Sequence, residues 1–131
     1  MAQELHHFIN GEKVKGESGR FDDVFNPATG EVTGSCPYAS AAEVDKAVQA
    51  AVAAFESWSE TPSPKRAQIM FKFREILLAN KDRLCELMGQ EHGKTIPDAA
   101  GEFQRGVEVV EYACGIPAAL KGEHSSNVGG N

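Results

Sequence analysis

Residues 40–58 read SAAEVDKAVQAAVAAFESW, and this stretch decides the fold class because its apolar residues recur at helical spacing. Ser40 and Glu43 stand three residues apart and form the signature of a capping box, in which each side chain bonds the backbone N–H of the other residue. We therefore predict a helix from Ser40 to about Trp58. Its apolar stripe consists of Val44, Val48, Ala51, Val52 and Phe55.

Two more helices are predicted downstream. The prolines of residues 61–64 break the first helix, and Ser63 is expected to cap a second one with Pro64 at its first position. This second helix should run to His92, where Gly93 can end it in a left-handed conformation. A third helix should start between Thr95 and Asp98 and end or kink at Pro117. The apolar faces are Ile69, Phe73, Ile76, Leu77, Leu84, Leu87 and Met88 in the second helix, and Phe103, Val107, Val110 and Cys114 in the third.

Upstream of residue 40 the pattern favours strands. Asn10-Gly11 is the dipeptide that best tolerates a tight hairpin turn, here between residues 7–9 and 13–15. A strand over 21–25, a turn over 26–30 and an extended stretch over 31–38 follow. The sequence thus predicts an α+β, mainly helical fold. It has a strand and hairpin region over 1–39, a region of three amphipathic helices over 40–120 and a loop over 121–131, all within one domain.

Composition excludes several classes of function. A net charge of -6, from 19 acidic and 13 basic side chains, gives no positive field to attract nucleic acid or an anionic membrane. The three cysteines are odd in number and widely spaced, as is typical of a reducing compartment. The sequence shows no signal peptide and no run of 18 apolar residues. We expect a soluble, cytoplasmic chain.

Motifs for direct chemistry are weak. Gly93-Lys94-Thr95 resembles the end of a phosphate-binding loop, but it follows a predicted helix and Met88 stands where the first glycine is needed. Gly129-Gly130 is not part of a dinucleotide fingerprint. The histidines, at 6, 7, 92 and 124, have no second ligand at helical spacing and are expected to be solvated. Of the cysteines, Cys114 lies on an apolar stripe and is expected to be buried, and no catalytic or metal-binding residue is assigned.

Arg105 is the one residue with two competing interpretations. It lies on the opposite face of the third helix from Phe103 and Val107, with Glu102 and Glu108 three positions to either side. Spacing alone favours an exposed arginine in i,i+3 pairs with these glutamates, worth only a few tenths of a kcal/mol.

Several segments together resemble the aldehyde dehydrogenase family. Residues 8–12 and 26–32 are similar to its opening "(F/Y)INGE … NPATGEV", residues 55–59 to an "AF..W" helix end, and residues 91–94 to an "E.GK" segment. Residues 101–111, followed by Ala113-Cys114 and Lys121-Gly122-Glu123, resemble the "GE..RG.E.VE.A … GE" block of methylmalonate-semialdehyde dehydrogenases. The arginine-glycine pair of that block is absent from general aldehyde dehydrogenases.

The resemblance implies an enzyme that oxidises methylmalonate or malonate semialdehyde with NAD and transfers the acyl group to coenzyme A with loss of carbon dioxide. It also gives Arg105 a substrate-binding role, because the substrate carries a carboxylate and a guanidinium can hold a carboxylate through two hydrogen bonds. The parent enzyme is expected to be a homo-oligomer.

Family members are several hundred residues long, and their nucleophilic cysteine and nucleotide-binding strands lie beyond the region that resembles this chain. We therefore expect an amino-terminal fragment that is inactive alone and binds no cofactor alone. The alternative is an autonomous helical interaction module derived from such an enzyme. Reading the gene beyond the codon for Asn131 would distinguish the two. The sequence leaves open whether the parent prefers methylmalonate or malonate semialdehyde.

Overall fold

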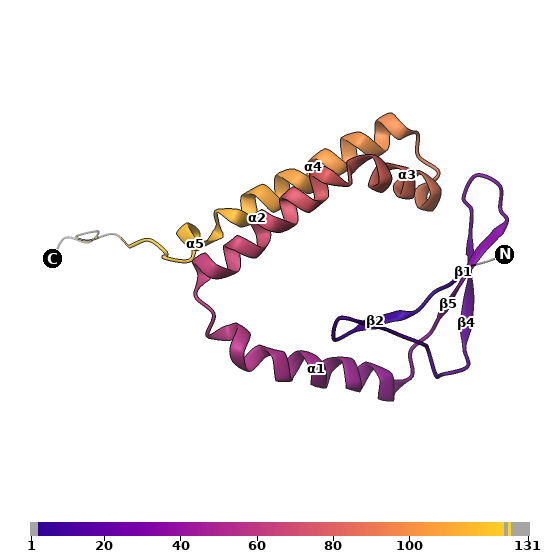
Figure 1. The fold of residues 1–131 in the computed structure, drawn as a ribbon, viewed down its shortest axis with the longest axis horizontal. Helices are drawn as coiled ribbons and strands as arrows, with labels where there is room; N and C mark the ends of the chain where they lie inside the picture. Colours follow the sequence, from indigo (N-terminus) through magenta and orange to yellow (C-terminus); the bar gives the residue numbers. More distant parts are fainter. Residues whose placement is uncertain (1–2, 125, 127–131) are drawn as a thin grey trace.

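The structure is a computed structural model that describes residues 3–124 and 126. It confirms the α+β, mainly helical fold, with an amino-terminal strand region followed by helices (Figure 1). The expected loop over 121–131 lies largely outside the described residues. The strands are β1 (Gln3–Glu4), β2 (His7–Ile9), β3 (Glu12–Val14), β4 (Phe21–Phe25) and β5 (Val32–Pro37), and the helices are α1 (Ala41–Ser59), α2 (Ser63–Ala79), α3 (Lys81–His92), α4 (Ile96–Cys114) and α5 (Ile116–Ala119).

The predicted hairpin is present, with its second strand one residue earlier than expected. Strands β2 and β3 pair antiparallel, with His7 opposite Val14 and Ile9 opposite Glu12. Asn10 and Gly11 form the two-residue turn with positive φ angles of 53° and 81°. Both angles belong to the type of turn whose twist matches that of paired strands, which is why this dipeptide fixes the register.

A separate sheet has the strand order β1-β5-β4. Strands β4 and β5 pair antiparallel on either side of the predicted turn. Asn26 stabilises that turn because its Oδ1 accepts from the backbone N–H of Ala28 at 2.9 Å. The two-residue strand β1 was not predicted. It pairs in parallel with β5, with Gln3 opposite Gly34.

Helix α1 begins as predicted. The Ser40 hydroxyl accepts from the backbone N–H of Glu43 at 3.3 Å, and the Glu43 carboxylate accepts from the backbone N–H of Ser40 at 2.7 Å. The capping box is therefore complete, and α1 ends one residue after the predicted Trp58.

The predicted second helix is wrong in two respects. It is divided at Asn80, whose side chain donates to the carbonyl of Ile76 at 2.8 Å and whose backbone leaves helical geometry at φ -114° and ψ 16°. Ser63 is already helical and caps nothing; the carbonyl of Pro62 instead accepts from the N–H groups of Lys65 and Arg66. Asparagine competes with the helical ladder by bonding nearby backbone groups, so the chain breaks there although the apolar pattern continues.

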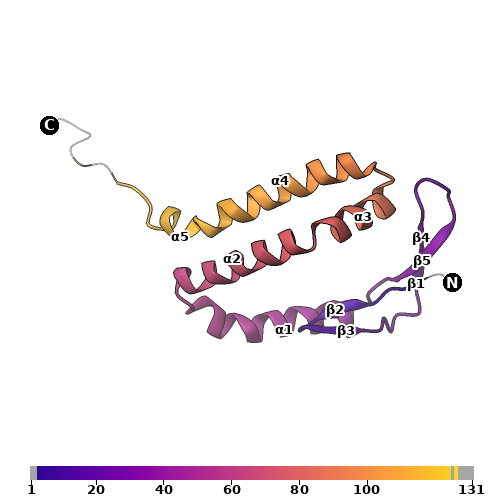
Figure 2. The same ribbon diagram turned by 45° about the horizontal axis from the view of Figure 1, so that its top comes forward.

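Helix α4 organises the hydrophobic core. Its stripe packs along both α2 and α3, and it ends before Pro117, which lies in the short helix α5. Figure 2 shows α4 above the broken line of α2 and α3, so one helix covers two. The buried residues of this layer are Ala67, Cys85, Ala99, Phe103, Val107, Val110 and Cys114.

Helix α1 lies apart from this helical layer. It forms no extensive contact with another element, and its apolar stripe is exposed, with Phe55 at 64% and Val52 at 58% (Figure 1). At the far end of the molecule, the turn between β4 and β5 reaches the link between α3 and α4. There a Cβ placed on Gly93 would lie 3.2 Å from Cγ of Pro27.

The surface is large for the mass of the chain. It measures 10257 Å², whereas a compact monomer of this mass exposes about 6,700 Å². None of the helices in the described part of the chain is long and apolar enough to cross a membrane.

Candidate functional site

Arg105 projects from the solvent face of α4. The helix buries Phe103 and Val107 against α2 and α3, which leaves Arg105 exposed on the other side, as its spacing predicts. A shallow hollow surrounds it. Gly101 and Gly106 contribute open space, since an added Cβ at either position would meet nothing within 4 Å. The lining residues are Lys94, Pro97, Asp98, Gly101, Glu102, Arg105, Gly106 and Val109.

The ion pairs expected for Arg105 are not formed. Glu102 accepts from Nζ of Lys94 instead, and Glu108 accepts from Nε2 of Gln104 at 3.4 Å. With the residues that the structure describes, Arg105 makes no ion pair within 4.0 Å. The spacing correctly predicted an exposed arginine, but it did not predict that both neighbouring glutamates have other partners.

The link between α3 and α4 places Lys94. Gly93 ends α3 in a left-handed conformation with φ 71°, as predicted, and its N–H bonds the carbonyl of Gly89. The hydroxyl of Thr95 then accepts from the backbone N–H of Asp98 at 3.4 Å and begins α4. Lys94 lies between these two fixed helix ends, from which its side chain reaches the second turn of α4.

The hydrogen bond from Lys94, followed by the charge of its ammonium group, lowers the pKa of Glu102. The charges of His92 and Arg105 contribute least to this shift. Glu102 is therefore an anion whose main partner is Lys94. Sequence reasoning missed Lys94, because it pairs across a helix boundary at a spacing that no helical pattern predicts.

The histidines lie mostly as expected. His6, His92 and His124 are exposed, but His7 is only 19% exposed, and its Nε2 lies 3.7 Å from Oε1 of Glu43. The expectation that it is solvated was wrong, because the hairpin folds over the start of α1. The described residues contain no group of three or more histidine, cysteine or acidic side chains that could hold a metal ion.

Cys85 and Cys114 are buried in the helical layer, which confirms the expected burial of Cys114, and Cys36 is exposed. Cys85 packs in the core cluster with Ala99, Phe103 and Val107. Burial therefore shields both thiols from a dissolved substrate.

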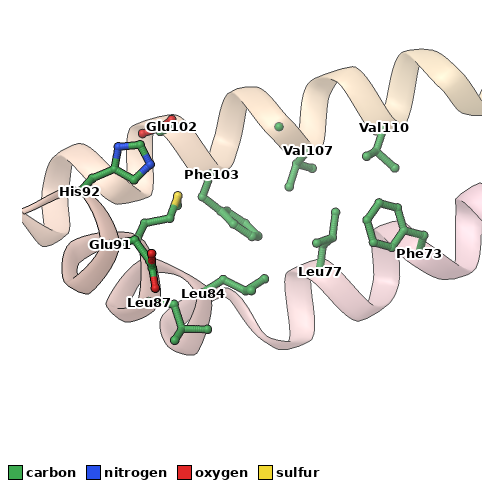
Figure 3. Close-up of a pocket in the computed structure, with 12 residues that line it drawn as sticks. Phe73, Leu77, Leu84, Leu87, Glu91, His92, Glu102, Phe103, Val107 and Val110 are labelled. Atoms are coloured by element: carbon green, nitrogen blue, oxygen red, sulfur yellow. The ribbon is translucent and has the colours of Figure 1, made fainter. Parts of the chain in front are cut away.

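A second hollow lies between α2, α3 and α4. Figure 3 shows Leu77, Leu84, Phe103 and Val107 pointing into it, with Glu91, His92 and Glu102 gathered at one end. Its walls are apolar, and the polar side chains stand only at the rim. We therefore interpret this hollow as part of the packing between the helices and not as a catalytic site.

Comparison with known proteins places this architecture. The sequence pattern described as the aldehyde dehydrogenase family matches residues 13–130. A malonate-semialdehyde dehydrogenase of Pseudomonas aeruginosa is 53% identical over 97% of the chain, and one of Bacillus pumilus is 41% identical over 96%. The chain spans 25% and 26% of the lengths of these two relatives, respectively.

Solved structures agree with the sequence relatives. A methylmalonate-semialdehyde dehydrogenase of Oceanimonas doudoroffii superposes with a TM-score of 0.88 at 52% identity, over 98% of this chain and 26% of that one. An NAD-dependent aldehyde dehydrogenase of Sinorhizobium meliloti superposes with a TM-score of 0.82 at 34% identity, over 98% of this chain and 26% of that one.

Proposed function

The chain belongs to the aldehyde dehydrogenase family, and from that premise we propose that it forms the amino-terminal part of a semialdehyde dehydrogenase. The substrate class is malonate or methylmalonate semialdehyde. The observation that carries the proposal is the superposition of nearly the whole chain on one quarter of the Oceanimonas doudoroffii enzyme. The two chains also share 52% sequence identity over this segment.

The proposed reaction oxidises the aldehyde carbon to the acyl level. NAD accepts the hydride, the thiol of coenzyme A accepts the acyl group, and carbon dioxide leaves from the substrate carboxylate. The described residues do not fit an NAD site, because none of their strands leads through a glycine-rich turn into a helix. We assign no residue of this chain to the binding of NAD or coenzyme A, and none of its cysteines as the catalytic thiol.

The proposed role of the segment is to form part of the protein around the catalytic centre. Its surface exceeds that of a compact monomer by about half, and the apolar stripe of α1 faces solvent. Both features suit a segment that packs against a larger protein body. Regions 1–39 and 40–120 would then belong to one enzyme domain, in a protein that assembles as a homo-oligomer.

The proposed contribution of this chain to substrate binding is Arg105. A semialdehyde of this class carries a carboxylate that simple aldehydes lack, and a guanidinium matches it with two parallel hydrogen bonds. Three features support the role: Arg105 is exposed, forms no ion pair with the described residues, and is bordered by the open space at Gly101 and Gly106.

A chimera tests the proposed function. The present chain would replace the matching quarter of the Pseudomonas aeruginosa enzyme, and NADH formation from malonate semialdehyde and coenzyme A would be followed. The chimera should keep kcat within about tenfold of that of the unmodified enzyme, since 53% identity preserves most packing contacts. A folded, correctly assembled chimera that does not turn over the semialdehyde would overturn the proposal. It would favour the alternative of a helical interaction module.

A further inference from the structure

We propose that Lys94 is a positioning residue for the substrate carboxylate: by pairing with Glu102, it keeps that glutamate away from Arg105 and leaves the guanidinium free. This inference rests on the proposed function. It adds a residue that acts through another one, because Lys94 itself has Glu102 as its partner.

The default partner of Arg105 is Glu102. Residues three apart on a helix have neighbouring side chains, and opposite charges at this spacing attract each other. Glu102 and Arg105 line the same hollow, yet Glu102 bonds Nζ of Lys94. Lys94 therefore competes with Arg105 for one carboxylate, and in this structure Lys94 holds it.

The other two carboxylates near Arg105 are also engaged. Asp98, which lines the hollow, interacts with the residue that caps α4, since its Oδ2 accepts from the hydroxyl of Thr95 at 3.1 Å. Glu108, one turn further along, accepts from Gln104. Among the described residues, these three acidic groups thus each have another partner, and of the three only Glu102 is held by a full positive charge.

The pair is also anchored at both ends. Lys94 lies between the left-handed Gly93 and the capping residue Thr95, and Glu102 lies within regular helix. Both side chains are open to solvent on one side, at 36% and 44% exposed. The lowered pKa of Glu102, caused first by the hydrogen bond from Lys94, agrees with this assignment.

Loss of Lys94 should therefore create an internal competitor for the substrate. Released Glu102 would pair with Arg105, and a surface pair of this kind is worth up to about fivefold in an equilibrium constant. The KM for malonate semialdehyde should rise by about 3- to 5-fold, whereas kcat should change little, because the lost interaction acts on ground state and transition state alike.

The experiment uses the chimera with Lys94→Met, and then with Lys94→Met combined with Glu102→Gln. The double variant should restore the KM to within about twofold of the chimera, because the neutral amide introduced by Glu102→Gln cannot neutralise Arg105. Lys72→Met is the matched control, since Lys72 forms a surface pair with Glu75 at 2.7 Å on α2. Propionaldehyde has no carboxylate, and its KM should be unaffected throughout.

The result that overturns the inference is an unchanged KM in Lys94→Met, or a double variant as impaired as the single one. If Lys94 had only a structural role, the double variant would be as impaired as the single one, since removing Glu102 cannot repair a misplaced link between α3 and α4. Failure of the proposed function looks different: Arg105→Leu would then leave semialdehyde turnover unchanged, or the folded chimera would be inactive.

Discussion

The carboxylate of Glu43 accepts a hydrogen bond from the backbone N–H of Glu17, 26 residues earlier in the chain, at 2.7 Å. Its other oxygen accepts from the N–H of Ser40, and the side chain is only 4% exposed. One carboxylate therefore caps α1 and fixes the link between the hairpin and the sheet. The hydrogen bonds from Ser40 and Glu17 together lower the pKa of Glu43 to about 2.

The first prediction is a pH dependence of this contact. Because the pKa of Glu43 falls from its ordinary 4.5 to about 2 on folding, the stabilisation is complete above pH 4.5 and is lost as the pH falls through about 2. The amide proton shift of Glu17, measured by NMR, should therefore titrate with a midpoint near 2. Glu43→Gln should abolish this step, whereas Glu56→Gln, an exposed change on the same helix, should not. A midpoint near 4.5 would contradict the prediction.

The second prediction concerns Arg105 in the chimera. Arg105→Leu should lower kcat/KM for malonate semialdehyde by about 30-fold to several thousand-fold. The reason is that the rest of the enzyme would cover the guanidinium and the bound substrate carboxylate, and losing one partner of such a covered charge pair costs about 2 to 5 kcal/mol. Turnover of propionaldehyde should change little. Arg105→Lys keeps the charge but cannot form two parallel hydrogen bonds. Its kcat/KM for malonate semialdehyde should lie between those of the chimera and of Arg105→Leu. Equal losses for both aldehydes would show that the arginine is structural.

The third prediction is that the 131-residue chain alone does not oxidise aldehydes. Two of its three thiols are buried among apolar side chains, and no described strand leads into a dinucleotide-binding turn. Absorbance of NADH should not rise with malonate semialdehyde, NAD and coenzyme A present. NADH formation that disappears in Cys36→Ser would refute this prediction.

The fourth prediction is that the chain alone self-associates. Val52 and Phe55 are 58% and 64% exposed on α1, and contiguous apolar surface of this kind drives association in water. Gel filtration should give a broad, early peak, and the double variant Val52→Lys/Phe55→Lys should shift it towards the monomer. Phe103→Lys should not help, because Phe103 is only 7% exposed and its replacement would disrupt the core. A sharp monomer peak for the unmodified chain would argue against exposed docking faces.

Local sequence signals predicted the parts of the fold that depend on neighbouring residues. The Asn10-Gly11 turn, the Ser40 cap and the left-handed Gly93 each follow from a few adjacent side chains. The break at Asn80 was missed, because the apolar stripe continues through it from Leu77 to Leu84. Strand β1 was missed because its two residues pair with a strand far along the chain, and periodicity carries no information on such pairing.

For the candidate site, too, the sequence predicted the features that depend on one helix and missed those that depend on two elements. The exposure of Arg105 follows from its position relative to Phe103 in a helical repeat. That it forms no ion pair with the described residues does not follow from this repeat, because Lys94 reaches Glu102 from a different element. The ordering of charges around a residue depends on tertiary placement, and helical spacing describes only the partners within one helix.

Gly93 is constrained both by its backbone conformation and by the neighbouring Pro27. Gly93 ends α3 in a left-handed conformation and directly precedes Lys94. It also lies next to the turn between β4 and β5, where an added Cβ would lie 3.2 Å from Cγ of Pro27. A mutation that replaces Gly93 would therefore affect more than one part of the structure. It would strain the left-handed backbone, and Pro27 would have to give way by a few tenths of an ångström to admit the added Cβ. In a genetic screen, a lesion of this kind would be scored as a folding defect, because it acts on the backbone at the end of a helix and on the neighbouring turn of the sheet.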